Sequence, residues 1–175
     1  MSRNTADVEV VGVVFDLSLR HSLNGIKHLD NVKTALIDFF RKNLEDDDIM
    51  YLYHPEIFET VNRIGAQVSA ISNYQTDGWK FDLPLALKQT LFIIAAEPYE
   101  SKKLLLFTDR LSDVSVLDRI DKLNKKDMFD CEITCFDIGC HLSQTDSVKI
   151  VNLENSDDLT SYTIKEKIYE ANDIR

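Results

Sequence analysis

An aliphatic run that ends in an acid constrains this chain more than any other feature. Residues 8–15 are mostly apolar or β-branched, and Asp16 follows them directly. Residues 103–108 repeat the design and are followed by Asp109. Such a run predicts a strand buried in a parallel sheet, and the carboxyl ends of parallel strands meet at one edge, where open α/β folds bind ligands. We therefore expect Asp16 and Asp109 to lie together at that edge.

The spacing of apolar residues predicts an alternation of strands and helices. We expect strands at 8–15, 49–53, 104–108, 131–138 and 148–153, and helices at about 29–44, 66–73, 83–96, 113–124 and 159–169. Residues 57–64 fit either a short edge strand or the start of a helix, and we favour an edge hairpin. Ser156, Asp157 and Asp158 are the expected caps of the last helix. Because helices separate the strands, the fold class is α/β, a doubly wound and mainly parallel sheet with helices on both faces and one antiparallel edge strand.

Length and charge narrow the class of protein. The chain has 175 residues, of which 44% are hydrophobic, so we expect a single domain over residues 1–175 with a flexible amino terminus at 1–6. Its formal net charge is −10, and no window gathers basic and aromatic residues, which argues against direct nucleic-acid binding. No signal peptide and no apolar run near the ~20 residues of a membrane span is visible, so we expect a soluble, intracellular, cytoplasmic protein without membrane contact.

The cysteines and the acidic run at 45–48 do not predict a metal site. Cys131, Cys135 and Cys140 lie in one segment, and His141 alone does not supply the second ligand pair that zinc needs. We expect the cysteines to be small buried side chains on a strand. The run at 45–48 is expected to be a solvated turn.

Four segments in order resemble the von Willebrand factor A (vWA) family. These are residues 13–18, 83–87, 105–109 and 133–139. The resemblance covers nearly the whole chain and implies the fold of integrin inserted domains and of many intracellular complex subunits. In that family the carboxyl edge often holds a divalent cation through an Asp-x-Ser-x-Ser motif, a threonine in a second loop and an aspartate in a third. Hard cations such as Mg²⁺ take these oxygen ligands.

The chain matches this metal site only in part. Asp16, Ser18 and Asp109 stand at family positions and are the candidate ligands. Arg20 stands where the second serine is expected, and a cation there would repel a metal. We hypothesise that the Arg20 guanidinium lies between the two carboxylates and neutralises them, the alternative being that it points to water.

The threonine position of the motif has two candidate placements. Alignment of residues 83–87 puts Phe81 there with Asp82 next, whereas Thr76 begins a loop-like motif about one helical turn too early. Thr76 or Asp82 is therefore a possible additional ligand. The site is expected to be a degenerate metal-ion-dependent adhesion site, with no cofactor bound or, alternatively, Mg²⁺.

The resemblance implies a non-enzymatic module for protein–protein interaction. We expect a scaffold that binds a protein partner, within a multi-subunit complex, through loops at the carboxyl edge of the sheet. Asp16, Ser18, Arg20, Trp79 and Asp109 are the candidate partner-binding residues. Trp79 is either an aromatic anchor for the partner or a cap on the core. The first alternative function is Mg²⁺-dependent capture of an acidic side chain of the partner.

A second alternative is catalytic. Asp16 at the end of a strand, with residues 106–109 as a second motif, also resembles haloacid dehalogenase-type phosphatases. Those enzymes need a second aspartate two residues after the nucleophile as general acid, and Ser18 stands there instead. The acidic pair that holds magnesium late in their fold is missing too, because Asp137 is followed by an isoleucine and a glycine.

Overall fold

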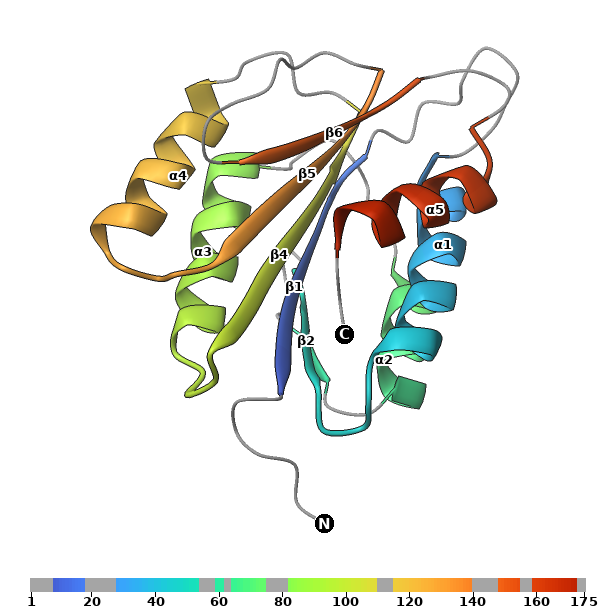
Figure 1. Ribbon diagram of the computed structural model, residues 1–175, viewed down its shortest axis with the longest axis horizontal. Helices are drawn as coiled ribbons and strands as arrows, with labels where there is room; N and C mark the ends of the chain where they lie inside the picture. Colours follow the sequence, from blue (N-terminus) through green and yellow to red (C-terminus); the bar gives the residue numbers. More distant parts are fainter. Residues whose placement is uncertain are drawn as a thin grey trace.

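Figure 1 shows the computed structural model of this chain, a twisted sheet between two layers of helices. The structure describes residues 8–17, 28–53, 59–61, 64–74, 82–109, 115–139, 148–154 and 159–172. Within these ranges the sheet has six strands in the order β3-β2-β1-β4-β5-β6. The strands are β1 (Glu9–Asp16), β2 (Ile49–Leu52), β3 (Glu59–Val61), β4 (Ser101–Thr108), β5 (Glu132–Ile138) and β6 (Lys149–Leu153).

The strand order places a topological switch point between β1 and β4. From β1 the chain winds outward through β2 to β3, and from β4 it winds the other way through β5 to β6. All pairs are parallel except β2 with β3, which is antiparallel. The predicted doubly wound sheet with an antiparallel edge strand is confirmed. In such sheets ligands bind where the winding reverses, beyond the carboxyl ends of the strands.

Helices cover both faces of the sheet (Figure 1). They are α1 (His28–Asn43), α2 (Ile64–Asn73), α3 (Leu83–Ala95), α4 (Ser115–Lys126) and α5 (Ser161–Ala171). One core cluster joins α1, α2 and α5 to the sheet, and the other joins α3 and α4 to its opposite face. Among the described helices none has the length and apolarity that crossing a bilayer requires.

Side chains of β1 alternate between the two cores. Val11 and Val13 belong to the core under α1, and Val10 and Val14 to the core under α3. Gly12 faces α3, and a Cβ at this position would lie 2.6 Å from Cγ2 of Thr90. The glycine therefore lets α3 approach the central strand closely, because a real Cβ would overlap the helix.

The ambiguous segment at 57–64 is resolved by the β2–β3 pair. In the antiparallel register Met50 is opposite Val61 and Leu52 is opposite Glu59. The helix that follows begins at Ile64, two residues before its predicted start. The favoured interpretation, an edge hairpin followed by a short helix, is confirmed.

The acidic run at 45–48 is not solvated throughout, and here the sequence-based expectation was wrong. Asp46 and Asp47 are exposed, but Asp48 is fully buried. Its carboxylate accepts hydrogen bonds from the backbone N–H groups of Glu9 at 2.9 Å and Glu45 at 2.8 Å. Asp48 therefore closes the turn after α1 and attaches it to the start of β1, since its carboxylate bonds to a backbone N–H in each.

The cap of α5 also differs from the expectation. Thr160 occupies the N-cap, and its hydroxyl oxygen accepts from the Thr163 N–H at 3.3 Å. The predicted caps, residues 156–158, lie outside the described residues. Thr160 and Thr163 follow the predicted acidic caps in the sequence and have the three-residue spacing of an N-cap bond, so the helix begins after Thr160.

Two of the three cysteines are buried free thiols, as predicted. Cys131 and Cys135 lie on or beside β5, and Cys140 and His141 lie outside the described residues. Burial, with a smaller contribution from the Glu132 carboxylate, raises the pKa of the Cys131 thiol to about 12. Burial likewise raises the pKa of the Cys135 thiol.

These pKa shifts predict slow thiol chemistry in the folded protein. Only the thiolate attacks a disulfide reagent, and a raised pKa leaves very little thiolate at pH 8. In a Cys140→Ser variant, we expect Cys131 and Cys135 to react slowly with Ellman's reagent in buffer and rapidly in denaturant. A thiol that reacts at the unfolded rate in buffer would contradict the buried placement.

Candidate functional site

A row of polar residues crosses the carboxyl edge of the sheet. Asp16 is in register with Thr108, Thr108 with Asp137, and Asp137 with Asn152, so four neighbouring strands carry a polar side chain at corresponding positions. Asp16, Thr108 and Asp137 are buried, whereas Asn152 is exposed. An apolar sheet therefore ends in a polar rim where β1 meets β4.

The rim brings Asp16 and Asp109 together. The Thr108 hydroxyl donates to Oδ2 of Asp16 at 3.0 Å. The Asp109 backbone N–H donates to the Asp16 carbonyl oxygen at 3.3 Å, one step beyond the last paired residues of β1 and β4. Asp16 and Asp109, which are 93 residues apart in the sequence, therefore lie at one rim, as we expected from the two similar aliphatic runs that precede them.

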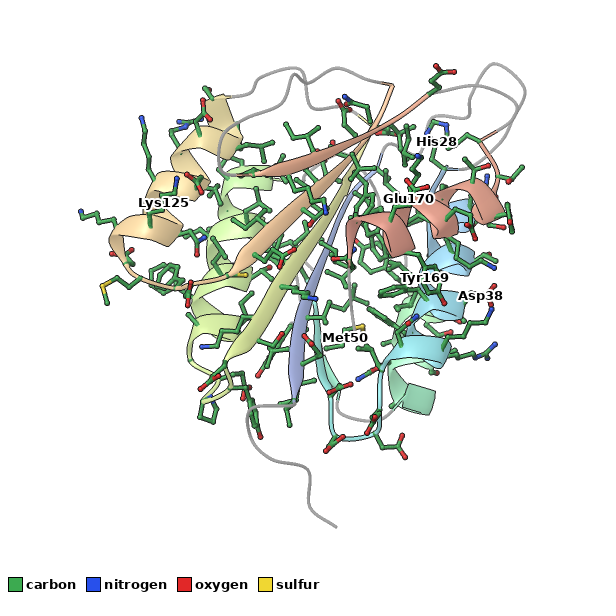
Figure 2. The ribbon with its side chains drawn as sticks, in the orientation of Figure 1. His28, Asp38, Met50, Lys125, Tyr169 and Glu170 are labelled. Carbon is green, nitrogen blue, oxygen red and sulfur yellow. The ribbon has the colours of Figure 1, made fainter. Side chains whose placement is uncertain are left out.

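The first residue of α1 adds a contact that the sequence analysis missed. Nδ1 of His28 lies 3.4 Å from Oδ2 of Asp109, and the exposed fractions of the two side chains are 7% and 5%. Because a carboxylate only accepts, the donor is the His28 N–H. Figure 2 shows His28 where α1 begins, near the end of the sheet at which this rim lies. The predicted topology could have indicated that His28 lies near the rim, since a helix that follows a parallel strand starts at the carboxyl edge of the sheet.

The charges of the rim act on a neighbouring thiol. Burial, followed by the Asp137 and Asp16 carboxylates, raises the pKa of Cys135, which stands two residues before Asp137 on β5. Asp16 and Asp137 stand two residues after Val14 and Cys135, which belong to the core under α3 and α4, so both carboxylates lie on that side of the sheet. Asp137 is fully buried, and, like Thr108 and Asn152 in the same row, it was not predicted as a site residue.

Aromatic packing supports the rim from the opposite face. Phe15, Phe107 and Phe136 stand one residue before the rim on β1, β4 and β5, in register with one another. The Phe107 and Phe136 rings stack at 4.7 Å between centroids, and Phe15 lies 5.9 Å from Phe107. Tyr74, just after α2, contacts Phe15 at 4.8 Å. A rigid aromatic layer thus fixes the strand ends that carry the polar groups.

Asp82, a possible metal ligand from the sequence, caps a helix. Its carboxylate accepts from the Leu85 N–H at 3.0 Å and so satisfies a free donor in the first turn of α3. Burial and the Asp82 charge together raise the pKa of Tyr53, which follows β2. Asp82 therefore lies at the same edge of the sheet, in a structural role at the start of α3.

The other predicted site residues lie outside the described residues. They are Ser18, Arg20, Thr76 and Trp79. The hypothesis that Arg20 lies between the two carboxylates therefore stays a hypothesis. Among the residues that the structure does describe, no three His, Cys, Asp or Glu side chains are grouped to hold a metal ion.

The described part of the rim offers a divalent cation two candidate ligands, the carboxylates of Asp16 and Asp109. Mg²⁺ takes six oxygen ligands at short distances. Here Oδ2 of Asp16 accepts from a hydroxyl, and Oδ2 of Asp109 faces an imidazole nitrogen. One oxygen of each carboxylate is therefore engaged by a group of the protein itself.

The His28 contact predicts a measurable loss of stability. We expect His28→Ala to lower the free energy of unfolding by about 1 kcal/mol, because one hydrogen bond to a buried carboxylate is removed. Urea denaturation followed by circular dichroism measures this difference. Lys42→Ala, at an exposed position of the same helix, is the matched control. Equal stability of the two variants would show that the contact does not hold α1 to the rim.

Comparisons with known proteins identify the fold. No family model matches the chain, and no curated protein matches it. Among solved structures, the SpRpn10 VWA domain is 13% identical with a TM-score of 0.60, covering 93% of this chain and 95% of that one. A von Willebrand factor type A structure from Catenulispora acidiphila is 15% identical with a TM-score of 0.63, over 94% of this chain and 42% of that one.

A third solved structure carries a metal at the family site. Proximal thread matrix protein 1 from the mussel byssus, described with a zinc-occupied MIDAS motif, is 15% identical with a TM-score of 0.60. The match covers 96% of this chain and 46% of that one, so this chain spans less than half of both longer structures. At such identities the likeness establishes the fold alone. The vWA-like fold predicted from the sequence is confirmed.

Proposed function

We propose that this chain, a domain with a vWA-like fold, is a non-enzymatic interaction module that binds a protein partner at the carboxyl edge of its sheet. Domains of this fold are often protein-interaction modules. The observation that carries the proposal is the internal pairing of the rim, where Thr108 donates to Asp16 and His28 contacts Asp109. We place the domain inside an intracellular multi-subunit complex, as a scaffold.

The internal pairing supports docking without a bound cation. Two carboxylates at one partly buried edge repel each other unless donors or a cation compensate them. Thr108 and His28 supply donors from within the fold. The metal site is therefore proposed to be lost or weakened, with Arg20 as a further positive charge beside it.

The same pairing argues against the phosphatase alternative. A nucleophilic aspartate must present an oxygen to its substrate beside a general acid. Asp16 is 6% exposed and its Oδ2 is hydrogen-bonded to Thr108. We expect no turnover of p-nitrophenyl phosphate, and hydrolysis that depends on Asp16 would favour the enzyme instead.

The proposed contacts with the partner lie around the rim. Ser18 and Arg20 follow β1 in the sequence, and Trp79 precedes α3. β1 ends at this edge of the sheet, and α3 begins there. A tryptophan and an arginine are the side chains most enriched among interface hot spots, so we assign the anchoring roles to them.

Site-specific photocrosslinking tests the edge directly. A benzophenone amino acid at Glu154, exposed just after β6, samples the rim, and one at Glu166, exposed on α5, samples a distant surface. In the native host we expect a discrete adduct from position 154 that Trp79→Ala weakens, and none from position 166. Identical adducts from both positions, or an adduct from 166 alone, would contradict docking at the carboxyl edge.

A further inference from the structure

Exposed apolar side chains gather on the layer of α3 and α4. Of the four large hydrophobic residues that stand out as exposed among those described, Leu85 and Phe92 lie on α3 and Met128 lies just after α4. The fourth, Tyr162, is on α5. A cluster of this kind on a polar surface marks an interaction site more often than scattered exposed residues do.

The α3 members of the cluster form one outward stripe. Leu85 and Phe92 are separated by seven residues, about two helical turns, so they lie on the same side of α3. Lys88 stands between them, with its ammonium 5.9 Å from the centroid of the Phe92 ring. Phe92 also packs edge to face against Phe129 at 5.0 Å. The stripe on α3 is therefore continuous with the turn that follows α4.

That turn holds Met128 outward in an unfavourable backbone conformation. Met128 is 83% exposed and has a φ of 53°, a region that favours glycine at the end of a helix. The turn is fixed, because the Phe129 N–H donates to the Asn124 carbonyl at 3.0 Å and the Asn124 side chain bonds to Cys131. A flexible methionine suits an adaptable binding surface, and packing within the fold does not account for its exposure.

Charge distinguishes this layer from the rest of the molecule. The helices α3 and α4 carry five basic and two acidic side chains, in a chain whose formal net charge is −10. Lys125, labelled in Figure 2 at the outer side of α4, pairs with Asp121 at 3.0 Å. Asp127 and Asp130 stand on either side of Met128 and Phe129 in the sequence, and the basic side chain that contacts the stripe is Lys88.

We propose that the face formed by Leu85, Lys88, Phe92, Met128 and Phe129, the α3–α4 face, is a second docking surface. Its occupant is an acidic amphipathic helix of a partner protein, with apolar side chains on Phe92 and Met128 and carboxylates toward the lysines. Leu85, Lys88 and Phe92 stand three and four residues apart on one side of α3, so they form a line along which a partner helix can pack. Leu85 stands in the first turn of α3 next to the rim, whereas Phe92 lies ten residues, roughly 15 Å, along α3 from Asp82. The part of the surface around Phe92 and Met128 is therefore separate from the rim. The domain can therefore bridge two partners.

Selection from a phage-displayed library of helical peptides, with the whole chain as bait, tests this surface. We expect the enriched peptides to be acidic and amphipathic, and to bind Phe92→Ser and Lys88→Glu about tenfold more weakly than the wild type. Met128→Gly is the variant that we expect to stay folded, because glycine readily adopts a positive φ and the change removes only an exposed side chain. It too should weaken binding while thermal stability is kept.

The possible results of the selection distinguish docking at the α3–α4 face from docking at the rim. Asp109→Asn, at the rim, should leave the selected peptides bound as tightly as before. Enrichment of neutral or basic peptides, binding that Asp109→Asn abolishes, or no enrichment at all would overturn the α3–α4 assignment and leave docking at the rim standing. Sedimentation with anionic lipid vesicles that requires Phe92 would also overturn it, in favour of a membrane surface.

Discussion

Replacing Phe107 by alanine is expected to lower the free energy of unfolding by about 3–5 kcal/mol, the usual cost of emptying a large buried aromatic site. Phe107 is fully buried at the centre of the sheet and stacks on Phe136 at an interplanar angle of 8°. Its other neighbour, Phe15, belongs to the adjacent strand. The cavity would open between the three central strands, which cannot collapse without breaking their ladder. Urea denaturation, followed by fluorescence and circular dichroism, measures the loss.

Tyr162→Ala is the matched control for Phe107. Tyr162 is an aromatic residue that is 63% exposed, so its removal should cost little. We also expect the Phe107 variant to loosen the rim, because Thr108 and Asp109 follow it directly. A cost for Phe107→Ala as small as that of the control would contradict the aromatic layer as the support of the rim.

Replacing Gly12 by alanine is expected to destabilise the protein by about 1–3 kcal/mol through overpacking. The added Cβ would stand 2.6 Å from Cγ2 of Thr90, a contact that real Cβ atoms do not make. Thr90 cannot simply rotate away, because its hydroxyl donates to the Ala86 carbonyl at 2.8 Å inside a buried helix. Either α3 must shift outward or β1 must bend.

A double variant identifies the cause of that loss. Thr90→Ser removes the clashing methyl and keeps the hydroxyl, so Gly12→Ala with Thr90→Ser should recover most of the stability. Gly65→Ala in α2 is the control, because its Cβ meets nothing within 4 Å and alanine favours a helix. Additive effects of the Gly12 and Thr90 changes would show that the contact is not the source of the strain.

Periodicity predicted most of the fold. Buried strands such as β4 are short aliphatic runs, and amphipathic helices such as α1 carry their apolar residues at spacings of three and four. Both patterns are local, which is why the element order, the edge hairpin and the doubly wound topology could be derived from the sequence. Element ends shifted by one to three residues: β4 begins at Ser101, three residues before its predicted start, and Thr160 caps α5 after the predicted caps.

The contacts that the sequence analysis missed are those that depend on partners far away in the sequence. His28 is an isolated histidine in the sequence, and its contact with Asp109 spans 81 residues. In the sequence Asp137 is simply a residue near the end of another predicted strand, and only its register with Thr108 places it at the rim. Asp48 resembled its exposed neighbours until the fold brought the Glu9 N–H to it. Local pattern carries none of this information.

The central claim is that the rim balances its own charges and presents a protein surface in place of a cation site. The most direct measurement is the melting temperature of the whole chain in millimolar MgCl₂ and in EDTA, since a ligand bound only by the native state raises that temperature. The claim predicts the same melting temperature in both solutions. A rise in magnesium that Asp16→Asn abolishes would contradict it and establish a working adhesion site.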